Sequence, residues 1–342
     1  MVTTLLVIVV ALALIFDYTN GFHDAANSIA TVVSTKVLTP FQAVVWAAAF
    51  NFLAYFVVTD HKVANTVAKI VVEEYVNIHV LLAGLLAAIT WNLITWWFGI
   101  PSSSSHTLIG GFAGAGITNA LYMGAAPLDA VNMNYITTII AYIVLAPVIG
   151  LTIGYVITVM IMWICRNARP AAAERWFKIL QLATSALLSF AHGTNDAQKV
   201  MGILYVALIA EKVIVRDAMG NMPGMPEWIP LACYSAIALG TMSGGWKIVK
   251  TMGSKITKIT SLEGVSAETA AAITLKMTEH FGIPVSTTHT ITGSIIGVGL
   301  TKRISAVRWG VTIPLMWAWI ITIPISAIIA GTVFMLMRVF GY

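Results

Sequence analysis

The sequence predicts an all-α membrane protein, built as an inverted-repeat helical bundle with broken or re-entrant helices and about 10–12 membrane segments. Three observations support this fold class. Of the 342 residues, 58% are hydrophobic and only 10% are charged, whereas soluble domains carry about 25% charged residues. The apolar runs are long and continuous, which excludes the alternating pattern of a membrane β-barrel. Two polar motifs also occur twice, once in each half of the chain.

Roughly ten apolar stretches approach the ~20 residues needed to cross a bilayer. The first, 2–35, is too long and too polar for one smooth helix. We expect a break near Asn20-Gly21, because glycine is tolerated where backbone groups find other partners. The span at 263–280 is the weakest, since Glu268, Lys276 and Glu279 interrupt it. The remaining spans are expected at 40–59, 78–98, 102–121, 135–163, 179–210, 229–243, 284–300 and 309–338.

A polar connection at 164–178 divides the chain into two repeats, 1–163 and 179–342. Both motif pairs recur at similar separations along the chain, which indicates a duplication. Each half holds an odd number of predicted crossings, so the second half enters the membrane from the opposite side. Inverted halves of this kind interlock around one shared site in secondary transporters.

The basic residues are distributed unevenly between the loops. If the N-terminus is outside, most Lys and Arg residues fall on inside segments, which is the positive-inside signature. We therefore expect both termini outside the cytoplasmic membrane. The net charge of +5 does not indicate a nucleic-acid partner, because the position of charges matters more in a membrane protein. The outside segments hold only Lys62, Lys69, Lys212, Arg216 and Arg338.

Two runs of hydroxyl residues follow a proline, Pro101–Thr107 in the first half and Pro284–Thr290 in the second. Proline suits the first turn of a helix, and serine and threonine cap helices, so each run predicts a half-helix. A helix N-terminus binds oxyanions through unpaired N–H groups. Two converging ends would form a cage for a tetrahedral anion, and ordinary capping is the alternative reading. The candidate anion-binding residues are Ser103, Ser104, Ser105, Thr107, Ser286, Thr287, Thr288 and Thr290.

His106 and His289 follow these hydroxyl runs at matching positions. They could donate to the anion or carry a proton, because histidine titrates near neutral pH. The other reading is that both are packing residues.

The second pair of motifs is Gly21–Asn27 and Gly193–Lys199, which place a carboxylate inside apolar runs. A charge in such a position marks a functional site by default. A carboxylate cannot bind an anion directly, but it can hold the accompanying cation or proton. Asp24 and Asp196 would be the sodium ligands if sodium is bound, and no other metal ligand is assigned. The candidate cation- and proton-coupling residues are Asp24, Asn27, Asn195, Asp196, His23, Lys199, His106 and His289.

The two copies of this motif differ in an informative way. Lys199 stands where the first copy has Asn27, and His23 stands where the second copy has Asn195. An ammonium near Asp196 could occupy the place of a sodium ion. We therefore expect at least one of two symmetry-related cation sites to have become a fixed charge or a protonatable group.

These motifs resemble those of the inorganic phosphate transporter (PiT) family, which has a Gly-x-Asn-Asp-x-x-Asn and a Pro-x-Ser-[Ser/Thr]-[Ser/Thr]-His motif in each half. The resemblance covers essentially the whole chain. It implies an inverted-repeat bundle, usually a homodimer, in which the hydroxyl motifs hold phosphate and the Asp/Asn motifs hold sodium in sodium-coupled members. The departures at His23, Gln198 and Lys199 resemble the bacterial low-affinity branch, often proton-coupled and able to carry phosphate as a neutral metal–phosphate complex.

The predicted function is import of inorganic phosphate across the cytoplasmic membrane by cation symport, with protons as the coupling ion. A sulfate permease and a sodium-coupled phosphate symporter are the alternatives within transport. An intramembrane aspartyl hydrolase would use the two aspartates as an acid/base pair, but no supporting motif context is present. No nucleotide-binding loop occurs either, so we expect no enzyme activity and no cofactor. The expected partners are phosphate, the lipid bilayer and a second copy of the chain.

Overall fold

The computed structural model describes residues 3–215 and 223–341, so Arg216 lies outside the described residues. Within these ranges the regular structure is helical apart from one isolated bridge between Val71 and Val131. This agrees with the predicted all-α class. In chain order the helices are α1 (Thr4–Ser34), α2 (Pro40–Val57), α3 (Lys62–Ala68), η1 (Glu73–Tyr75), α4 (Ile78–Phe98), α5 (Ser104–Tyr122), η2 (Pro127–Ala130), α6 (Met133–Ile164), α7 (Pro170–Ala210), α8 (Trp228–Ser243), α9 (Trp246–Lys250), η3 (Thr251–Lys255), α10 (Ser261–His280), α11 (Thr287–Leu300), η4 (Ile304–Ala306) and α12 (Trp309–Val339).

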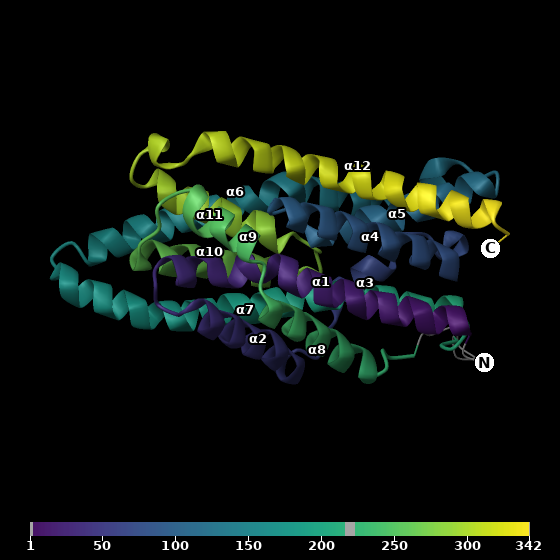
Figure 1. Ribbon diagram of the computed structural model, residues 1–342, viewed down its shortest axis with the longest axis horizontal. Coiled ribbons are helices and arrows are strands. Elements are labelled where there is room, and N and C mark those ends of the chain that lie inside the picture. The colour runs from purple at the N-terminus through teal and green to yellow at the C-terminus, as the bar shows by residue number, and fades with distance from the viewer. Residues whose placement is uncertain (1–2, 216–222, 342) are drawn as a thin grey trace.

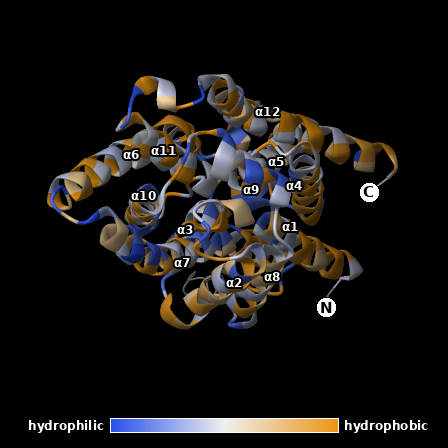
Figure 2. Cartoon of the chain, turned by 60° about the vertical axis from the view of Figure 1, so that its left-hand side comes forward, coloured by the Kyte–Doolittle hydropathy of each residue, from blue (hydrophilic) through white to orange (hydrophobic). Residues whose placement is uncertain are grey.

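The outer surface of the bundle is apolar, as a lipid-facing surface must be. Among the described residues, five helices are long and apolar enough to cross a membrane, namely α1, α2, α4, α6 and α12. Large apolar side chains point outward from them, for example Val144 and Ile328. Hydrophobic residues dominate the outer helices in Figure 2, whereas many hydrophilic residues lie toward the middle of the bundle. The polar motifs of the sequence therefore belong to the interior.

The predicted break near Asn20-Gly21 is wrong, because α1 runs unbroken from Thr4 to Ser34. Its counterpart α7 is also continuous, over 41 residues. The glycines serve close helix packing instead. A Cβ at Gly21 would lie 2.3 Å from the carbonyl oxygen of Ile237 in α8, and one at Gly193 would lie 2.8 Å from the Cα of Asn51 in α2.

The chain is interrupted at other places. A short non-helical segment separates α2 from α3, and Gly244 with φ 65° separates α8 from α9. Both α5 and α11 begin among buried residues, after Pro101 and Pro284. With 14 residues, α11 is also shorter than a bilayer span. The helices α5 and α11, which begin inside the bundle, are the re-entrant elements of the fold.

The two halves of the chain run in opposite directions. The Thr3 hydroxyl donates to Glu211 Oε2 at 2.6 Å, and the Thr35 hydroxyl donates to Gln181 Oε1 at 2.9 Å. The start of α1 therefore lies beside the end of α7, and the end of α1 lies beside the start of α7. Each half-helix packs against a long helix of the other half. The helix α5 of the first half packs on α12 of the second, and α11 of the second half packs on α6 of the first. Both chain termini lie at the same end of the bundle (Figure 1).

Candidate functional site

The N-termini of α5 and α11 meet the middle of α1 and α7 around two carboxylates. Asp24 of α1 and Asp196 of α7 are no more than 2% exposed. The Thr287 hydroxyl, in the first turn of α11, lies 3.2 Å from Asp196 Oδ2 and 3.5 Å from Asp24 Oδ2. A hydroxyl has one hydrogen, so Thr287 donates to one carboxylate at a time. The structure thus brings both acids to one half-helix end.

Asp24 has a histidine and a hydroxyl as its neighbours. His23 Nδ1 lies 2.6 Å from Asp24 Oδ1, and the Ser104 hydroxyl donates to the same oxygen at 3.2 Å. The other ring nitrogen, His23 Nε2, lies 3.0 Å from the Thr95 hydroxyl of α4. Ser102 donates to that hydroxyl at 2.9 Å. This chain of contacts links the first carboxylate to the start of α5.

Asp196 has an ammonium as its strongest partner. Lys199 Nζ donates to Asp196 Oδ1 at 2.6 Å, to the Ser105 hydroxyl at 2.5 Å and to the Val285 carbonyl at 2.8 Å. The lysine therefore touches α7, the first turn of α5 and the residue just before the α11 cap. A buried charge needs such pairing to be tolerated. The lysine thus puts a positive charge directly beside Asp196.

His192 and Asn51 complete the surroundings of Asp196. His192 Nε2 lies 3.3 Å from Asp196 Oδ2, and His192 Nδ1 lies 3.2 Å from Asn51 Oδ1. The side chain of Asn51 then donates to the Thr241 hydroxyl of α8 at 2.9 Å. Neither His192 nor Asn51 was among the sequence candidates. The spacing of one helical turn between His192 and Asp196 was an available signal, whereas Asn51 carried none.

The eight predicted hydroxyl residues divide into two groups. Ser103 and Ser286 accept from the backbone N–H groups of His106 and His289, at 3.1 and 3.2 Å. Thr107 and Thr290 donate to carbonyl oxygens of their own helices, at 2.8 and 2.9 Å. Ser103 and Ser286 are therefore N-caps, and Thr107 and Thr290 bond to the backbone of their own helices. The hydroxyls that contact the acids, the lysine or Asn27 are those of Ser104, Ser105, Thr287 and Thr288.

The two asparagines differ in their contacts. Asn27 Nδ2 donates to Thr287 and Thr288 at 3.1 and 3.0 Å. Within the described part of the chain, Asn27 Oδ1 and both polar side-chain atoms of Asn195 have no hydrogen-bond partner. Buried polar atoms without partners are rare in folded proteins. Amide oxygens in this state can accept a cation or the hydrogen of a bound substrate.

His106 and His289 pack against each other rather than against the carboxylates. Their ring centroids are 4.7 Å apart, and His289 stacks on Trp319 of α12 at 4.3 Å. In residues 3–215 and 223–341, His106 Nδ1 and both ring nitrogens of His289 have no hydrogen-bond partner. The rings therefore join the two half-helices behind the site. A proton-carrying role for them stays a prediction.

Glu268 is a further buried carboxylate. In the sequence it stood out only as a charge that interrupts the weak predicted span at 263–280. Glu268 of α10 accepts from Thr31 at 2.6 Å and from Gln181 at 2.9 Å, and Thr184 donates to its other oxygen. Thr31 lies one helical turn beyond Asn27. Glu268 thus ties α1, α7 and α10 together close to the site.

The arrangement can serve both an anion and its cation. The first backbone N–H groups of α5 and α11 lack intrahelical acceptors and carry the positive end of each helix dipole. Together with Lys199 they favour an oxyanion. Ligand atoms of Asp24, His192 and Asp196 all lie within 4.8 Å of one another, which is compact enough to hold a metal ion.

Comparison with known proteins gives the family. The family described as "Phosphate transporter family" matches residues 20–172 and 165–330. The chain belongs to this family. It is 46% identical to a "Probable low-affinity inorganic phosphate transporter" of Rhizobium meliloti (strain 1021), over 96% of this chain and 95% of that protein. A protein of the same description from Bacillus subtilis (strain 168) is 42% identical, over 99% and 98%.

More distant relatives agree. The "Low-affinity inorganic phosphate transporter PitA" of Escherichia coli (strain K12) is 26% identical, over 97% of this chain and 96% of that one. A solved structure, "The sodium-dependent phosphate transporter", superposes with a TM-score of 0.85 at 25% identity, covering 98% of this chain and 100% of that chain. The predicted family and membrane fold are confirmed. The matching family and the relatives named here are described as transporters rather than enzymes.

Proposed function

We propose that this protein imports phosphate across the cytoplasmic membrane as a secondary active symporter, with protons as the coupling ion. The observation that carries the proposal is the contact of Thr287 with both Asp24 and Asp196 at the end of α11. It joins the helix end suited to an oxyanion to the two acids suited to its counter-charge. Anion and cation therefore occupy one site and move together.

The nitrogen partners of the acids favour protons over sodium. Lys199 already supplies a positive charge 2.6 Å from Asp196, which disfavours a second cation beside that carboxylate. The Asp24–His23 pair, 2.6 Å apart, holds two groups that can exchange a proton. Proton uptake at this pair would reduce the net negative charge of the site when phosphate is bound.

Phosphate suits this site better than sulfate does. Near neutral pH phosphate keeps a hydrogen that it can donate to a carboxylate, whereas sulfate has none. A site built to accept a substrate hydrogen rejects an analogue that lacks it, because its buried acceptor is left unpaired. Asp24, or Asp196 once its lysine swings aside, would be that acceptor.

Two variants of the proposal rest on specific atoms. The unpartnered oxygens of Asn27 and Asn195 suit a hard cation such as sodium, which supports sodium coupling as the second candidate. The cluster of Asp24, His192 and Asp196 suits a divalent ion, which would allow phosphate to travel as a metal complex. In either case the cation would be cargo. A homodimer and outside termini stay predictions.

The test is uptake of labelled phosphate by purified protein in liposomes, with proton and sodium gradients imposed separately at a clamped membrane potential. We expect an inward proton gradient to drive accumulation and a sodium gradient alone to have no effect. Accumulation driven by sodium alone would transfer the proposal to its second candidate. Absence of uptake under every gradient, with and without added Mg²⁺, would overturn it.

A further inference from the structure

The turn that precedes each half-helix has the same sequence and the same shape. Phe98–Pro101 and Phe281–Pro284 both read Phe-Gly-Ile-Pro. Gly99 and Gly282 have φ of 67° and 68°, a left-handed conformation that favours glycine. In both turns the isoleucine N–H donates to the carbonyl five residues earlier, at 2.9 Å, as at a helix end closed by a Schellman motif. The turns therefore set the positions of α5 and α11.

A short helix holds each turn through the same two side chains. Lys62 Nζ donates to the carbonyl of His280 at 3.4 Å, and the Thr66 hydroxyl donates to that of Gly282 at 2.7 Å. Lysine and threonine are four residues apart and so share one helix face. We call this pair the first latch.

The other turn is held in the matching way. Lys247 Nζ donates to the carbonyl of Trp97 at 2.9 Å. The Thr251 hydroxyl lies 3.3 Å from the carbonyl of Gly99 and 3.2 Å from that of Lys247, and it can donate to either. Lysine and threonine are again four residues apart. This pair, at the junction of α9 and η3, is the second latch.

The latches lie toward opposite ends of the bundle. The first packs on α7 beyond Asp196, where a Cβ at Gly202 would lie 2.6 Å from the carbonyl of Ala64. The second packs on α1 beyond Asp24, where a Cβ at Gly253 would lie 2.6 Å from the carbonyl of Ala30. Since α1 and α7 are antiparallel, the two latches lie between the site and opposite ends of the bundle.

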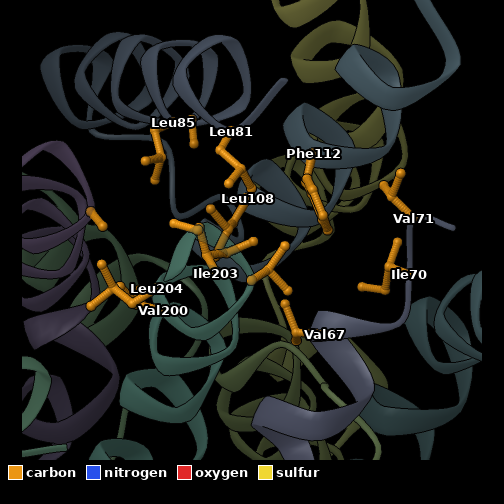
Figure 3. Close-up of a cluster of buried hydrophobic side chains, with 14 of the residues drawn as sticks. Val67, Ile70, Val71, Leu81, Leu85, Leu108, Phe112, Val200, Ile203 and Leu204 are labelled. Atoms are coloured by element: carbon orange, nitrogen blue, oxygen red, sulfur yellow. The ribbon is translucent and has the colours of Figure 1, made fainter. Parts of the chain in front are cut away.

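Each latch carries an apolar plug on its inner face. On α3 this is Val63 and Val67, which are both buried. Figure 3 shows Val67 in the same buried hydrophobic cluster as Ile203 of α7, and a Cβ at Gly202 of α7 would lie 3.2 Å from Val67 Cβ. On α9 and η3 it is Ile248 and Met252, which are also buried. Both plugs are buried, and Asp24 and Asp196 between them are no more than 2% exposed.

The first latch is also connected to the site itself. The backbone N–H of Val63 donates to Gln198 Oε1 at 3.1 Å, and Gln198 precedes Lys199. The corresponding N–H in the second latch, that of Ile248, bonds locally to Gly245 at 2.9 Å instead. Cavities of about 1040 and 480 Å³ border the first latch, and Thr59 and Asp60 line both. The first latch thus has space beside it and a hydrogen bond to the residue that precedes the buried lysine.

We infer that Lys62, Thr66, Lys247 and Thr251 are positioning residues of the transport cycle, acting as two matched latches that open one at a time toward opposite faces. Release of the first latch frees the turn before α11 and lifts Val67. Release of the second frees the turn before α5 and lifts Met252. The inference rests on the proposed transport function, because it assigns the gates of the same site.

The test is sided thiol labelling of single-cysteine reporters, Val67→Cys and Met252→Cys, in right-side-out and inverted membrane vesicles with an impermeant maleimide. Cys165→Ser and Cys233→Ala remove the native thiols, and if this background folds poorly the native thiols are kept and the parent signal is subtracted. We expect Thr66→Val to raise the labelling rate at Val67→Cys about three- to tenfold, from one face only. Thr251→Val should do the same at Met252→Cys from the opposite face.

Thr138→Val is the matched control, since among the described residues the Thr138 hydroxyl bonds only within its own helix, to the Asn134 carbonyl at 2.8 Å. It should change neither rate. Equal responses of both reporters to one latch variant, responses from the same face, or no response would overturn the inference. Labelling does not require transport, so phosphate uptake by the parent protein in the same vesicles separates failure of the latches from failure of the proposed function.

Discussion

Asp24 and Asp196 occupy matching positions in α1 and α7, yet their surroundings differ. Asp24 is paired with a neutral or protonatable histidine and a serine hydroxyl. Asp196 is paired with a lysine ammonium and a second histidine. The comparison shows that two matching carboxylates need not keep equal partners. Asp196 has a lysine ammonium 2.6 Å away, whereas Asp24 has a histidine ring at the same distance.

The comparison predicts unequal consequences when each acid is neutralised. Asp24→Asn and Asp196→Asn should each lower the initial rate of phosphate uptake about 100-fold, because each removes a charge at the shared site. Only Asp196→Asn leaves a buried ammonium uncompensated, which costs about 3–5 kcal/mol of unfolding free energy. Thermal unfolding of the detergent-solubilised variants would measure the difference. Lys199→Met added to Asp196→Asn should restore stability without restoring uptake, and equal stability of the two single variants would refute the assigned asymmetry.

The next largest loss of phosphate uptake is expected at Thr287, whose hydroxyl lies between the two carboxylates. Thr287→Val removes the group that contacts both carboxylates and accepts from Asn27, so we expect kcat/KM for phosphate to fall about tenfold. Thr290→Val is the matched control, because in the part of the chain that the structure describes that hydroxyl donates only to the Ser286 carbonyl, at 2.9 Å. It should change uptake less than about twofold. Similar losses in the two variants would mean that Thr287 has a structural role alone.

Competition between sulfate and phosphate tests whether Asp24 or Asp196 accepts a hydrogen from the substrate. A tenfold excess of sulfate should leave labelled phosphate uptake within about twofold of its uninhibited rate, because sulfate offers no hydrogen to a buried carboxylate. Arsenate, which does carry one, serves as the positive control and should compete. Strong inhibition by sulfate would show that the site does not use the substrate hydrogen.

The smallest loss of phosphate uptake is expected at His192, which lies beside Asp196. His192→Gln removes a 3.3 Å contact with Asp196, but the stronger Lys199 contact at 2.6 Å stays. We expect uptake to fall no more than about threefold. A loss as large as that of Asp196→Asn would make His192 the main partner of the carboxylate.

The sequence was enough to predict the helical membrane fold and both pairs of polar motifs, since a charge inside an apolar run is costly and is kept mainly where it serves a site. It was not enough to distinguish a glycine that breaks a helix from one that lets two helices touch, which is why the break in α1 was wrong. Ser103 and Ser104 illustrate the same limit. Both are serines in one motif, yet only the backbone conformation decides which caps the helix and which faces Asp24.

Residues brought together only by tertiary structure escaped sequence reasoning. Thr95 and Asn51 come from α4 and α2, where nothing in the local sequence sets them apart. Lys62 and Thr66 form a pattern only when compared with Lys247 and Thr251, and the repeated Phe-Gly-Ile-Pro of the two turns does not indicate which side chains hold their carbonyl groups. Such contacts depend on how the two halves interlock.

The most direct measurement is phosphate uptake by Lys199→Asn in liposomes under separately imposed proton and sodium gradients, compared with the unmodified protein. The substitution gives the second copy the residue that the first has at this position, Asn27. We predict that uptake becomes stimulated by a sodium gradient and loses part of its response to the proton gradient, because a cation can then bind beside Asp196. Unchanged dependence on both gradients would contradict the account.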